Sequence, residues 1–367
     1  MTHGETRARR IALVLGGGGM KGFAHLGVMQ ALEERGIHPT VYAGTSIGAL
    51  LAAAAVGGMP LADMRRRAET MRRRDLFRIN HLGMLMERMR SPSIYTAEPV
   101  RELVHDIVPA GTFKDLPTRL LVNTVDIGRA TQVVWGAPGL EDASIRDAVY
   151  ASCALPGFFP PGKVAGRTCL DGGVIDNVPV HIAGMFADVV IAVDVGNSEI
   201  RPISEGLSSG FANISMRALT TMMHALQQVP LTVWNGPPMV LIRPRVDEDW
   251  LSFAHTTETI AEGHRSAVAA LEHFDAYVER PGGVYPRREV ELEVVRDRCI
   301  GCRLCASLAP GMMGIDASGK AFARARTTEW SPADGDFVHH CPTDAIIPHT
   351  VRHVEIRRSG ERERLAG

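Results

Sequence analysis

An apolar run that ends in four consecutive glycines constrains the fold of this chain more than any other feature. Ile11 to Leu15 is apolar, Gly16 to Gly19 follow, and the pattern from Phe23 to Glu34 is helical. A short apolar run before a turn is typical of a buried strand. Glycine permits positive φ and close approach of other atoms. A glycine turn before a helix also directs backbone N–H groups at one point, which suits an anion. The sequence therefore predicts a strand, an anion-binding turn and a helix.

The same order of elements is repeated directly downstream. Thr40 to Ala43 is predicted to be a strand, Gly44-Thr45-Ser46-Ile47-Gly48 a tight turn, and Ala49 to Val56 a helix of small apolar residues. Alternating strands and helices favour a mainly parallel sheet covered by helices, which is the α/β fold class. Similar patterns predict further strands at 118–126, 168–171, 189–193 and 239–242, and helices at 97–108, 142–152, 216–229 and 259–274.

The composition is that of a globular protein without a global charge bias. The 367 residues are 45% hydrophobic and 22% charged, with a formal net charge of −1, so charge gives no reason to expect a nucleic-acid partner. No window reaches the ~18 apolar residues of a membrane-spanning helix. The basic start is followed by an apolar run too short for a signal peptide. Six cysteines do not suggest a secreted disulfide framework, so we expect a cytoplasmic protein.

The second turn, Gly44-Thr45-Ser46-Ile47-Gly48, matches the Gly-x-Ser-x-Gly nucleophile elbow. In that motif a sharp strand-to-helix turn exposes the serine hydroxyl, and the flanking glycines Gly44 and Gly48 remove Cβ atoms that would clash. The pentapeptide alone has low specificity, but here it follows a predicted strand and precedes a small-residue helix. A serine also needs a base and oxyanion stabilisation, and the glycine run offers peptide N–H donors. Ser46 is therefore the predicted nucleophile of an acyl transfer.

Two residues are candidates for the base that would activate Ser46. Asp171 ends a predicted strand before Gly172 and Gly173, where a carboxylate could accept the serine proton directly. His181 follows Asp171 and fits the Ser…Asp…His order of α/β-hydrolases, although a capping or core histidine is its more ordinary interpretation. Nucleotide binding fits less well, because the glycine run lacks both the dinucleotide-binding spacing and the Gly-Lys-Ser/Thr ending of a P-loop.

Three blocks of the sequence together resemble the signature blocks of patatin-like phospholipases. The blocks are Gly16-Gly17-Gly18-Gly19-Met20-Lys21-Gly22, Gly44-Thr45-Ser46-Ile47-Gly48 and Asp171-Gly172-Gly173. The resemblance covers about residues 8–275 and implies a three-layer αβα fold with a mainly parallel sheet. It also implies an acyl hydrolase that acts on lipid esters through a Ser46–Asp171 dyad and without a catalytic histidine.

The resemblance further implies which groups would stabilise the oxyanion. Gly17, Gly18 and Gly19 would supply the N–H donors. The cation Lys21 would hold the loop or bias the site towards negative charge. The remaining glycines would shape the three turns, namely Gly16, Gly22, Gly44, Gly48, Gly172 and Gly173.

Residues 60–95 are unusually rich in arginine. They contain nine cations and four anions, with apolar residues between them. A solvated helix face beside core residues is the ordinary interpretation. The alternative is a basic amphipathic cap that meets anionic lipid headgroups, and it gains weight if the substrate is a lipid. Peripheral membrane contact through 60–95 is therefore part of the expectation.

Four of the six cysteines lie in the last quarter of the chain, in a pattern typical of iron–sulfur proteins. Cys299, Cys302 and Cys305 form a Cys-x2-Cys-x2-Cys run, and Cys341 is followed by proline, as in bacterial ferredoxins. A second cluster would require a cysteine at position 309, which is alanine. With all four thiolates present, a [4Fe–4S] cluster is preferred to a [3Fe–4S] cluster.

Zinc is the alternative occupant of the four cysteines. Structural zinc usually takes two separated Cys-x2-Cys pairs, whereas here the split is three and one; a cluster lost through decay is a further alternative. Residues 291–357 resemble a single-cluster bacterial ferredoxin. We therefore expect a small α+β domain over 291–358, joined by a linker at 280–290 to an acyl hydrolase domain over 8–279.

A cluster implies an electron partner, which the balanced charges of 291–367 do not identify. Two other overall functions stay open at this point. One is a redox or electron-transfer protein with a lipid-binding patatin-like module. The other is a hydrolase whose cluster has only a folding role.

Overall fold

The computed structural model divides into two compact units, one ending at Glu272 and the other beginning at His273. It describes residues 9–79, 93–196, 210–227, 229–246, 251–331, 333–334 and 336–353. The expected linker, 280–290, contains the strand β9 (Val284–Tyr285) and the start of β10 (Arg288–Val294). The expected end of the second domain, at 358, lies outside the described residues. We describe each unit by itself.

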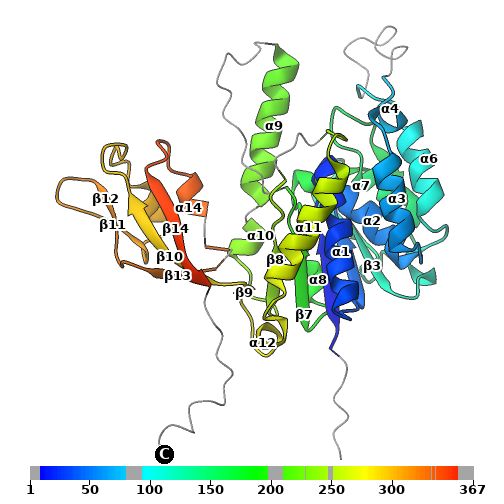
Figure 1. Cartoon of the computed structure of the whole chain (residues 1–367). Helices are drawn as coiled ribbons and strands as arrows, with labels where there is room; N and C mark the ends of the chain where they lie inside the picture. Colours follow the sequence, from blue (N-terminus) through cyan, green and yellow to red (C-terminus); the bar gives the residue numbers. More distant parts are fainter. Residues whose placement is uncertain are drawn as a thin grey trace, which may run out of the picture. The chain divides into compact units, whose positions relative to one another are not determined.

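The first unit is built on a mainly parallel sheet (Figure 1). Its strands follow the order β5 (Gly162–Val164), β6 (Arg167–Asp171), β3 (Arg119–Asp126), β2 (Val41–Gly44), β1 (Ile11–Leu15), β7 (Val189–Val193) and β8 (Met239–Ile242). Neighbours from β3 to β8 are parallel, whereas β6 pairs antiparallel with β3 and β5 pairs antiparallel with β6. A further strand, β4 (Thr131–Trp135), pairs antiparallel with β3.

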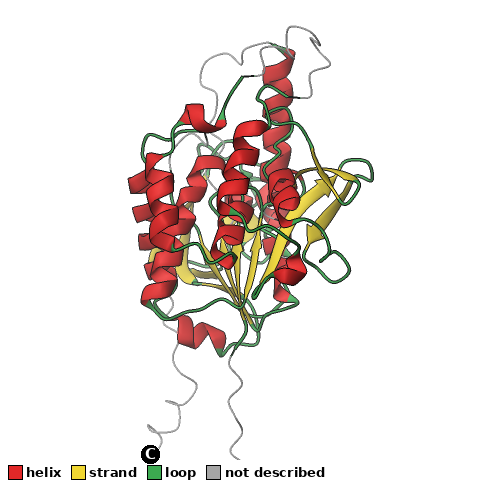
Figure 2. Cartoon of the chain, turned by 90° about the vertical axis from the view of Figure 1, so that its right-hand side faces the viewer, coloured by secondary structure: helices red, strands yellow, loops and turns green. Residues whose placement is uncertain are grey.

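Helices lie on both sides of this sheet and give the expected three-layer αβα architecture (Figure 2). The α-helices are α1 (Ala24–Glu34), α2 (Ile47–Val56), α3 (Leu61–Thr70), α4 (Arg73–Leu76), α6 (Glu98–Ile107), α7 (Ile145–Ser152), α8 (Val180–Gly184), α9 (Phe211–Gln227), α10 (Val229–Thr232) and α11 (Thr256–Ala270). The 3-10 helices are η1 (Gly19–Phe23), η3 (Phe113–Asp115) and η4 (Gly172–Val174). Among the described residues, no helix combines the length and the hydropathy needed to cross a bilayer.

The central strands explain why this sheet forms the core. β7 and β8 are buried along their whole length, and β1 at every residue after Ile11. Uninterrupted apolar runs of this kind are typical of strands that are covered on both faces. Because the carboxyl ends of parallel strands meet at one edge of the sheet, β1 and β2 bring Gly16 and Ser46 to the same edge.

The predicted strands in the first unit are confirmed to within one residue. The predicted helix at 142–152 begins later, at Ile145, and the one at 216–229 begins earlier, at Phe211. Two strands, β4 and β5, are absent from the prediction, because each is a short hairpin strand beside a turn and too brief to show periodicity. In the basic segment α3 and α4 are seen, and residues 80–92 lie outside the described residues.

The second unit has the small α+β character that the sequence predicts. Its strands β10, β13 (Thr328–Trp330) and β14 (Ile346–His353) form an antiparallel sheet in the order β13-β10-β14. β11 (Met313–Ile315) and β12 (Ala321–Ala323) form a second antiparallel pair. Three short helices accompany them, α12 (Phe274–Val278), α13 (Leu304–Leu308) and α14 (Asp336–His339). Cys299 and Cys305 belong to the buried core of this unit.

Candidate active site and metal centre

Ser46 lies in the turn between β2 and α2, in a backbone conformation that few L-residues adopt. Its φ is 56° and its ψ is −126°. A Cβ atom on Gly48 would lie 2.1 Å from the carbonyl oxygen of Leu15, and one on Gly44 would lie 2.5 Å from the backbone of Gly48. Both flanking positions therefore require glycine, for the steric reason that the motif predicts. Strained backbone at a non-glycine residue is typical of a functional turn.

Two buried residues tie this turn to the rest of the core. The Ser46 backbone N–H donates a hydrogen bond to Ser152 Oγ over 2.9 Å. The Ser152 hydroxyl in turn donates to the carbonyl oxygen of Asn123 over 2.7 Å. Ser152 and Asn123 are fully buried, so the elbow is held by α7 and β3. Sequence reasoning missed Ser152, because a serine at the end of a helix carries no distinctive pattern.

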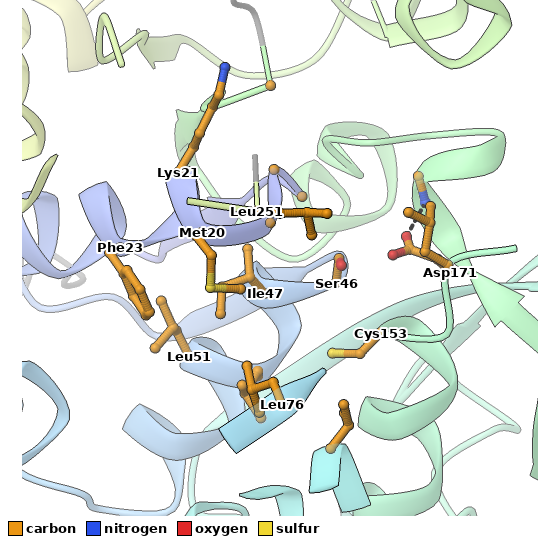
Figure 3. A pocket seen from close by; sticks show the side chains of 18 of the residues that line it. Met20, Lys21, Phe23, Ser46, Ile47, Leu51, Leu76, Cys153, Asp171 and Leu251 are labelled. Carbon is orange, nitrogen blue, oxygen red and sulfur yellow. Dashed lines mark hydrogen bonds between the residues drawn. The ribbon is translucent and has the colours of Figure 1, made fainter. Parts of the chain in front are cut away.

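Asp171 ends β6, and its side chain faces the same cavity as Ser46 (Figure 3). Burial raises the pKa of Asp171 to about 6, against the opposing effects of the Gly173 N–H and the Ser46 hydroxyl. The Gly173 N–H donates to Asp171 Oδ1 over 2.8 Å. The Ser46 hydroxyl lies near enough to Asp171 to favour its carboxylate form. The carboxylate is thus fixed next to the nucleophile.

The glycine loop borders this cavity, but its three central N–H groups are not equivalent. The Gly17 N–H donates to Asn177 Oδ1 over 3.1 Å, and Asn177 Nδ2 donates back to the Gly17 carbonyl over 2.9 Å. Within the described residues nothing accepts a hydrogen bond from the Gly18 N–H. Gly17, Gly18 and Gly19 all line the cavity. Sequence reasoning did not identify Asn177, because its partner lies 160 residues away.

A buried histidine supports the loop from inside the protein. His25 is 0% exposed, and its Nε2 lies 2.8 Å from the Gly16 carbonyl oxygen. Burial lowers the pKa of His25 to about 4, against the opposing effect of the Gly16 carbonyl. The ring is therefore neutral at neutral pH, and a proton on Nε2 is donated to Gly16.

The histidine considered as a base from the sequence lies elsewhere. His181 is exposed on α8, where its ring lies 5.3 Å from the ring of Trp234, and it does not line the cavity of Ser46. Of the two candidate bases, only Asp171 shares that cavity. His224 of α9 does line the cavity, and sequence reasoning did not single it out.

The cavity has a volume of about 400 Å³ and a mainly apolar wall. The wall is drawn largely from α2, α3, α4, α6 and the loop after α7, including Leu50, Met64, Leu76, Phe77, Leu103 and Phe159. Cys153 lies beside Asp171, and burial together with the Asp171 charge raises the pKa of its thiol. Cys153 is therefore a neutral thiol at neutral pH. The side chain of Lys21 points away from Ser46 and Asp171 (Figure 3).

In the second unit the four predicted cysteines border one small cavity. Cys299 and Cys305 are buried, Cys341 is half-buried and Cys302 is exposed. The Ala321 N–H donates to Cys299 Sγ over 3.4 Å. Among the described residues, no three His, Cys, Asp or Glu side chains lie close enough together to hold a single ion.

Backbone donors also act on the fourth thiol. The Ala345 N–H donates to Cys341 Sγ over 3.3 Å. Burial acts to raise the pKa of Cys341, but the N–H groups of Thr343 and Ala345 outweigh it, so the pKa is lowered. These N–H groups thus favour the thiolate form of Cys341.

Comparison with known proteins gives a result for each unit. Residues 13–183 match the model of the patatin-like phospholipase family, and residues 290–347 match that of the 4Fe-4S single cluster domain. An uncharacterised NTE family protein of Mycobacterium tuberculosis is 37% identical over 194 residues, which are 53% of this chain and 51% of the relative. Lysophospholipase nte1 of Aspergillus fumigatus is 32% identical over 192 residues, which are 52% of this chain and 12% of that enzyme.

The chain thus spans about half the length of the mycobacterial relative and a smaller part of the fungal one. Among solved structures, VipD from Legionella pneumophila is 17% identical, with 72% of this chain and 67% of VipD covered and a TM-score of 0.38. The family models decide the assignment. The chain therefore contains a patatin-like phospholipase domain, matched over residues 13–183, and a domain that matches the 4Fe-4S single cluster family over residues 290–347.

Proposed function

We propose that this protein hydrolyses carboxylic esters of lipids, with Ser46 as nucleophile and Asp171 as general base. One observation carries the proposal: the serine of a strained elbow and a buried carboxylate face the same apolar cavity. The second candidate base, His181, lies outside that cavity. A Ser–Asp dyad therefore agrees with the geometry better than a triad with His181.

The proposed reaction begins with proton transfer from Ser46 Oγ to Asp171, which is ionised above pH 6. The serine oxygen attacks the ester carbonyl carbon and forms a tetrahedral oxyanion. When the intermediate collapses, the alcohol leaves and takes the proton from Asp171. Water then attacks the acyl-enzyme, Asp171 accepts the proton of the water, and Ser46 recovers its own when the fatty acid leaves.

We assign the oxyanion donors to Gly18 and Gly19 rather than to all three predicted glycines. The N–H of Gly17 is engaged by Asn177, so its role in this proposal is to hold the loop. The Gly18 N–H has no acceptor among the described residues and lies at the cavity. A donor of this kind typically contributes roughly 10²–10³ in rate.

Two further observations support a lipid as the ester. The cavity wall is mainly apolar, which suits an acyl chain, and one relative is a lysophospholipase by name. Peripheral contact with lipid headgroups through the arginine-rich segment 60–95 also belongs to the proposal. Of that segment, residues 60–79 and 93–95 are described.

We also propose that Cys299, Cys302, Cys305 and Cys341 hold a [4Fe–4S] cluster, with [3Fe–4S] and zinc as the alternatives. All four thiols border one cavity, and backbone N–H groups donate to two of the sulfurs. Such hydrogen bonds tune cluster potentials. A bound cluster would supply one-electron transfer or redox sensing.

The test is hydrolysis of p-nitrophenyl acyl esters and of lysophosphatidylcholine by matched variants. Ser46→Ala and Asp171→Asn should each lower kcat by ~10³-fold or more. His181→Ala, the control, should change it by less than about threefold. Full activity of Ser46→Ala would overturn the proposal. If the parent protein binds lipid without hydrolysing it, the patatin-like domain is a lipid-binding module of a redox protein.

A further inference from the structure

Helix α9 presents two faces of different character. One face lines the cavity that holds Ser46, through Arg217, Thr220, Met223, His224 and Gln227. On the other face Ile214, Met222 and Leu226 are 49%, 57% and 41% exposed. These residues are separated by eight and by four positions, so they lie along one side of the helix. The helix therefore carries an apolar stripe directly behind one wall of the cavity.

The stripe is long and uncharged. Residues 211–227 contain one arginine, one histidine and no acidic residue, and both basic residues lie on the cavity face. In α10 and just after it, Val229 and Val233 continue the exposure, at 49% and 58%. Isolated exposed apolar residues are ordinary, whereas a continuous exposed stripe marks an interaction surface.

The opposite wall of the cavity is basic at its outer surface. α3 and α4 contribute Met64 and Leu76 to the wall, while residues 61–79 contain seven arginines and three acidic residues. Arg66 and Arg74 have side chains that are 71% and 88% exposed. Arg72, Arg73 and Arg78 are also exposed.

These two walls belong to the same region of the first unit. α4 and the outer end of α9 both lie at the upper end of this unit in Figure 1. A helix with an uncharged apolar stripe and a cluster of arginines thus flank the cavity from two sides.

We infer that α9 inserts its exposed stripe into an anionic phospholipid surface while the arginines of α3 and α4 bind the headgroups. An apolar helical face beside flanking cations is the combination that holds a protein in the membrane interface. The net positive charge of 61–79 is complementary to that surface. Arg66 and Arg74 pair with Asp63 and Asp75 of their own segment, but the segment keeps an excess of positive charge. A second copy of the chain would cover the stripe but would bring the same excess of positive charge with it. Membrane binding by α9 does not depend on the proposed function. Only the role of that binding, delivery of a lipid ester to the cavity, rests on it.

Vesicle binding by the full-length Ser46→Ala protein tests the inference without degradation of the lipid. The probes are vesicles of phosphatidylcholine alone and of phosphatidylcholine with phosphatidylglycerol, assayed by co-sedimentation. We expect binding that increases with phosphatidylglycerol. Adding Met222→Glu and Leu226→Glu should weaken it more than about tenfold, because two carboxylates would enter the interface. Arg73→Ala with Arg74→Ala should weaken binding to the anionic vesicles selectively.

The control is Val268→Glu on α11, which places one such carboxylate at another exposed apolar residue, 38% exposed. It should alter vesicle binding by less than about twofold. Unchanged vesicle binding by Met222→Glu/Leu226→Glu would overturn the inference. If that variant instead converts a dimer to a monomer in sedimentation velocity while still binding vesicles, the stripe is an interface between copies and the inference is wrong.

A parallel measurement separates this inference from the proposed function. In the chain with Ser46 intact, Met222→Glu/Leu226→Glu should hydrolyse a water-soluble ester within about twofold of the parent rate. Its hydrolysis of vesicle lipid should fall together with binding. If the parent hydrolyses neither substrate, the proposed function fails, and the binding results still decide the role of α9.

Discussion

Asn177 and Gly17 form a reciprocal pair of hydrogen bonds, with the Gly17 N–H donating to Asn177 Oδ1 over 3.1 Å and Asn177 Nδ2 donating to the Gly17 carbonyl over 2.9 Å. Asn177 lies shortly after the Asp171-Gly172-Gly173 block, whereas Gly17 belongs to the glycine loop. The pair therefore locks the loop that carries the proposed oxyanion donors to the segment that carries the proposed base.

Asn177→Ala should uncouple these two segments. It leaves the buried Gly17 carbonyl without its side-chain donor, which typically costs about 1–3 kcal/mol, whereas the Gly17 N–H keeps the Asn177 backbone carbonyl as an acceptor over 3.3 Å. We expect a loss of that order in the free energy of unfolding and a decrease of ~10–100-fold in kcat on a water-soluble ester. Urea denaturation and steady-state kinetics measure the two effects. A wild-type kcat together with the stability loss would show that Asn177 has only a structural role.

The activity should depend on pH through Asp171. Burial raises the pKa of this carboxyl to about 6, and a general base must be ionised. We therefore expect kcat/KM on a water-soluble ester to rise as pH increases through about 6 and then to level off. A profile without a step between pH 5 and 7, in an enzyme that still requires Asp171, would contradict this assignment.

The same raised pKa has a consequence for stability. The folded protein binds the Asp171 proton more tightly than the unfolded chain, so this group destabilises the fold progressively as pH rises from about 4 to 6. Above pH 6 the cost is complete, at about 1–3 kcal/mol. Asp171→Asn should therefore be inactive but more stable than the parent at pH 7, with the difference vanishing near pH 4. Urea denaturation of the parent and of Asp171→Asn at pH 4 and pH 7 tests this. Equal free energies of unfolding at pH 7 would contradict the expected cost of the buried Asp171 carboxylate.

His25 should produce the opposite pH dependence. Burial lowers its pKa to about 4, so the unfolded chain binds the proton more tightly and stability is lost as pH falls from about 6.5 to 4. The full effect is about 3 kcal/mol for this one ring. The difference in unfolding free energy between the parent and His25→Gln should therefore shrink over that range. A difference that is constant with pH would show that the ring accepts a proton in the folded state.

Metal binding can be tested by one substitution at a time in the second unit. Anaerobically purified protein should contain about four iron atoms per chain and absorb near 400 nm. Cys341→Ser should lower both the iron content and the absorbance, whereas the control Cys153→Ser in the first unit should not. Zinc in place of iron would contradict the proposed cluster. Ester hydrolysis by oxidised and reduced protein then tests redox control, and equal rates would exclude it.

Much of the fold follows from short-range patterns in the sequence. The strands β1, β7 and β8 can be predicted from their apolar runs, because each strand is buried on both faces. The nucleophile elbow can be predicted because a Cβ atom at Gly44 or Gly48 would clash with nearby backbone, so the turn requires glycine at both positions. In contrast, β4 and β5 depend on pairing with β3 and β6, so nothing in their own few residues predicts them.

In the candidate site, too, some residues are marked by their neighbours in the chain and others only by tertiary contacts. Ser46, Asp171 and the four cysteines are each marked by immediate neighbours in the chain, and the sequence by itself determined them as candidates. Only the tertiary structure decided that Asn177 occupies the Gly17 N–H, that Ser152 anchors Ser46, and that α9 turns one face to the cavity and another outward. The partners in these hydrogen bonds are more than 100 residues apart. A local pattern reflects the steric requirements and spacing of a single turn. These long-range hydrogen bonds and the cavity wall form only when the sheet brings distant segments to one edge.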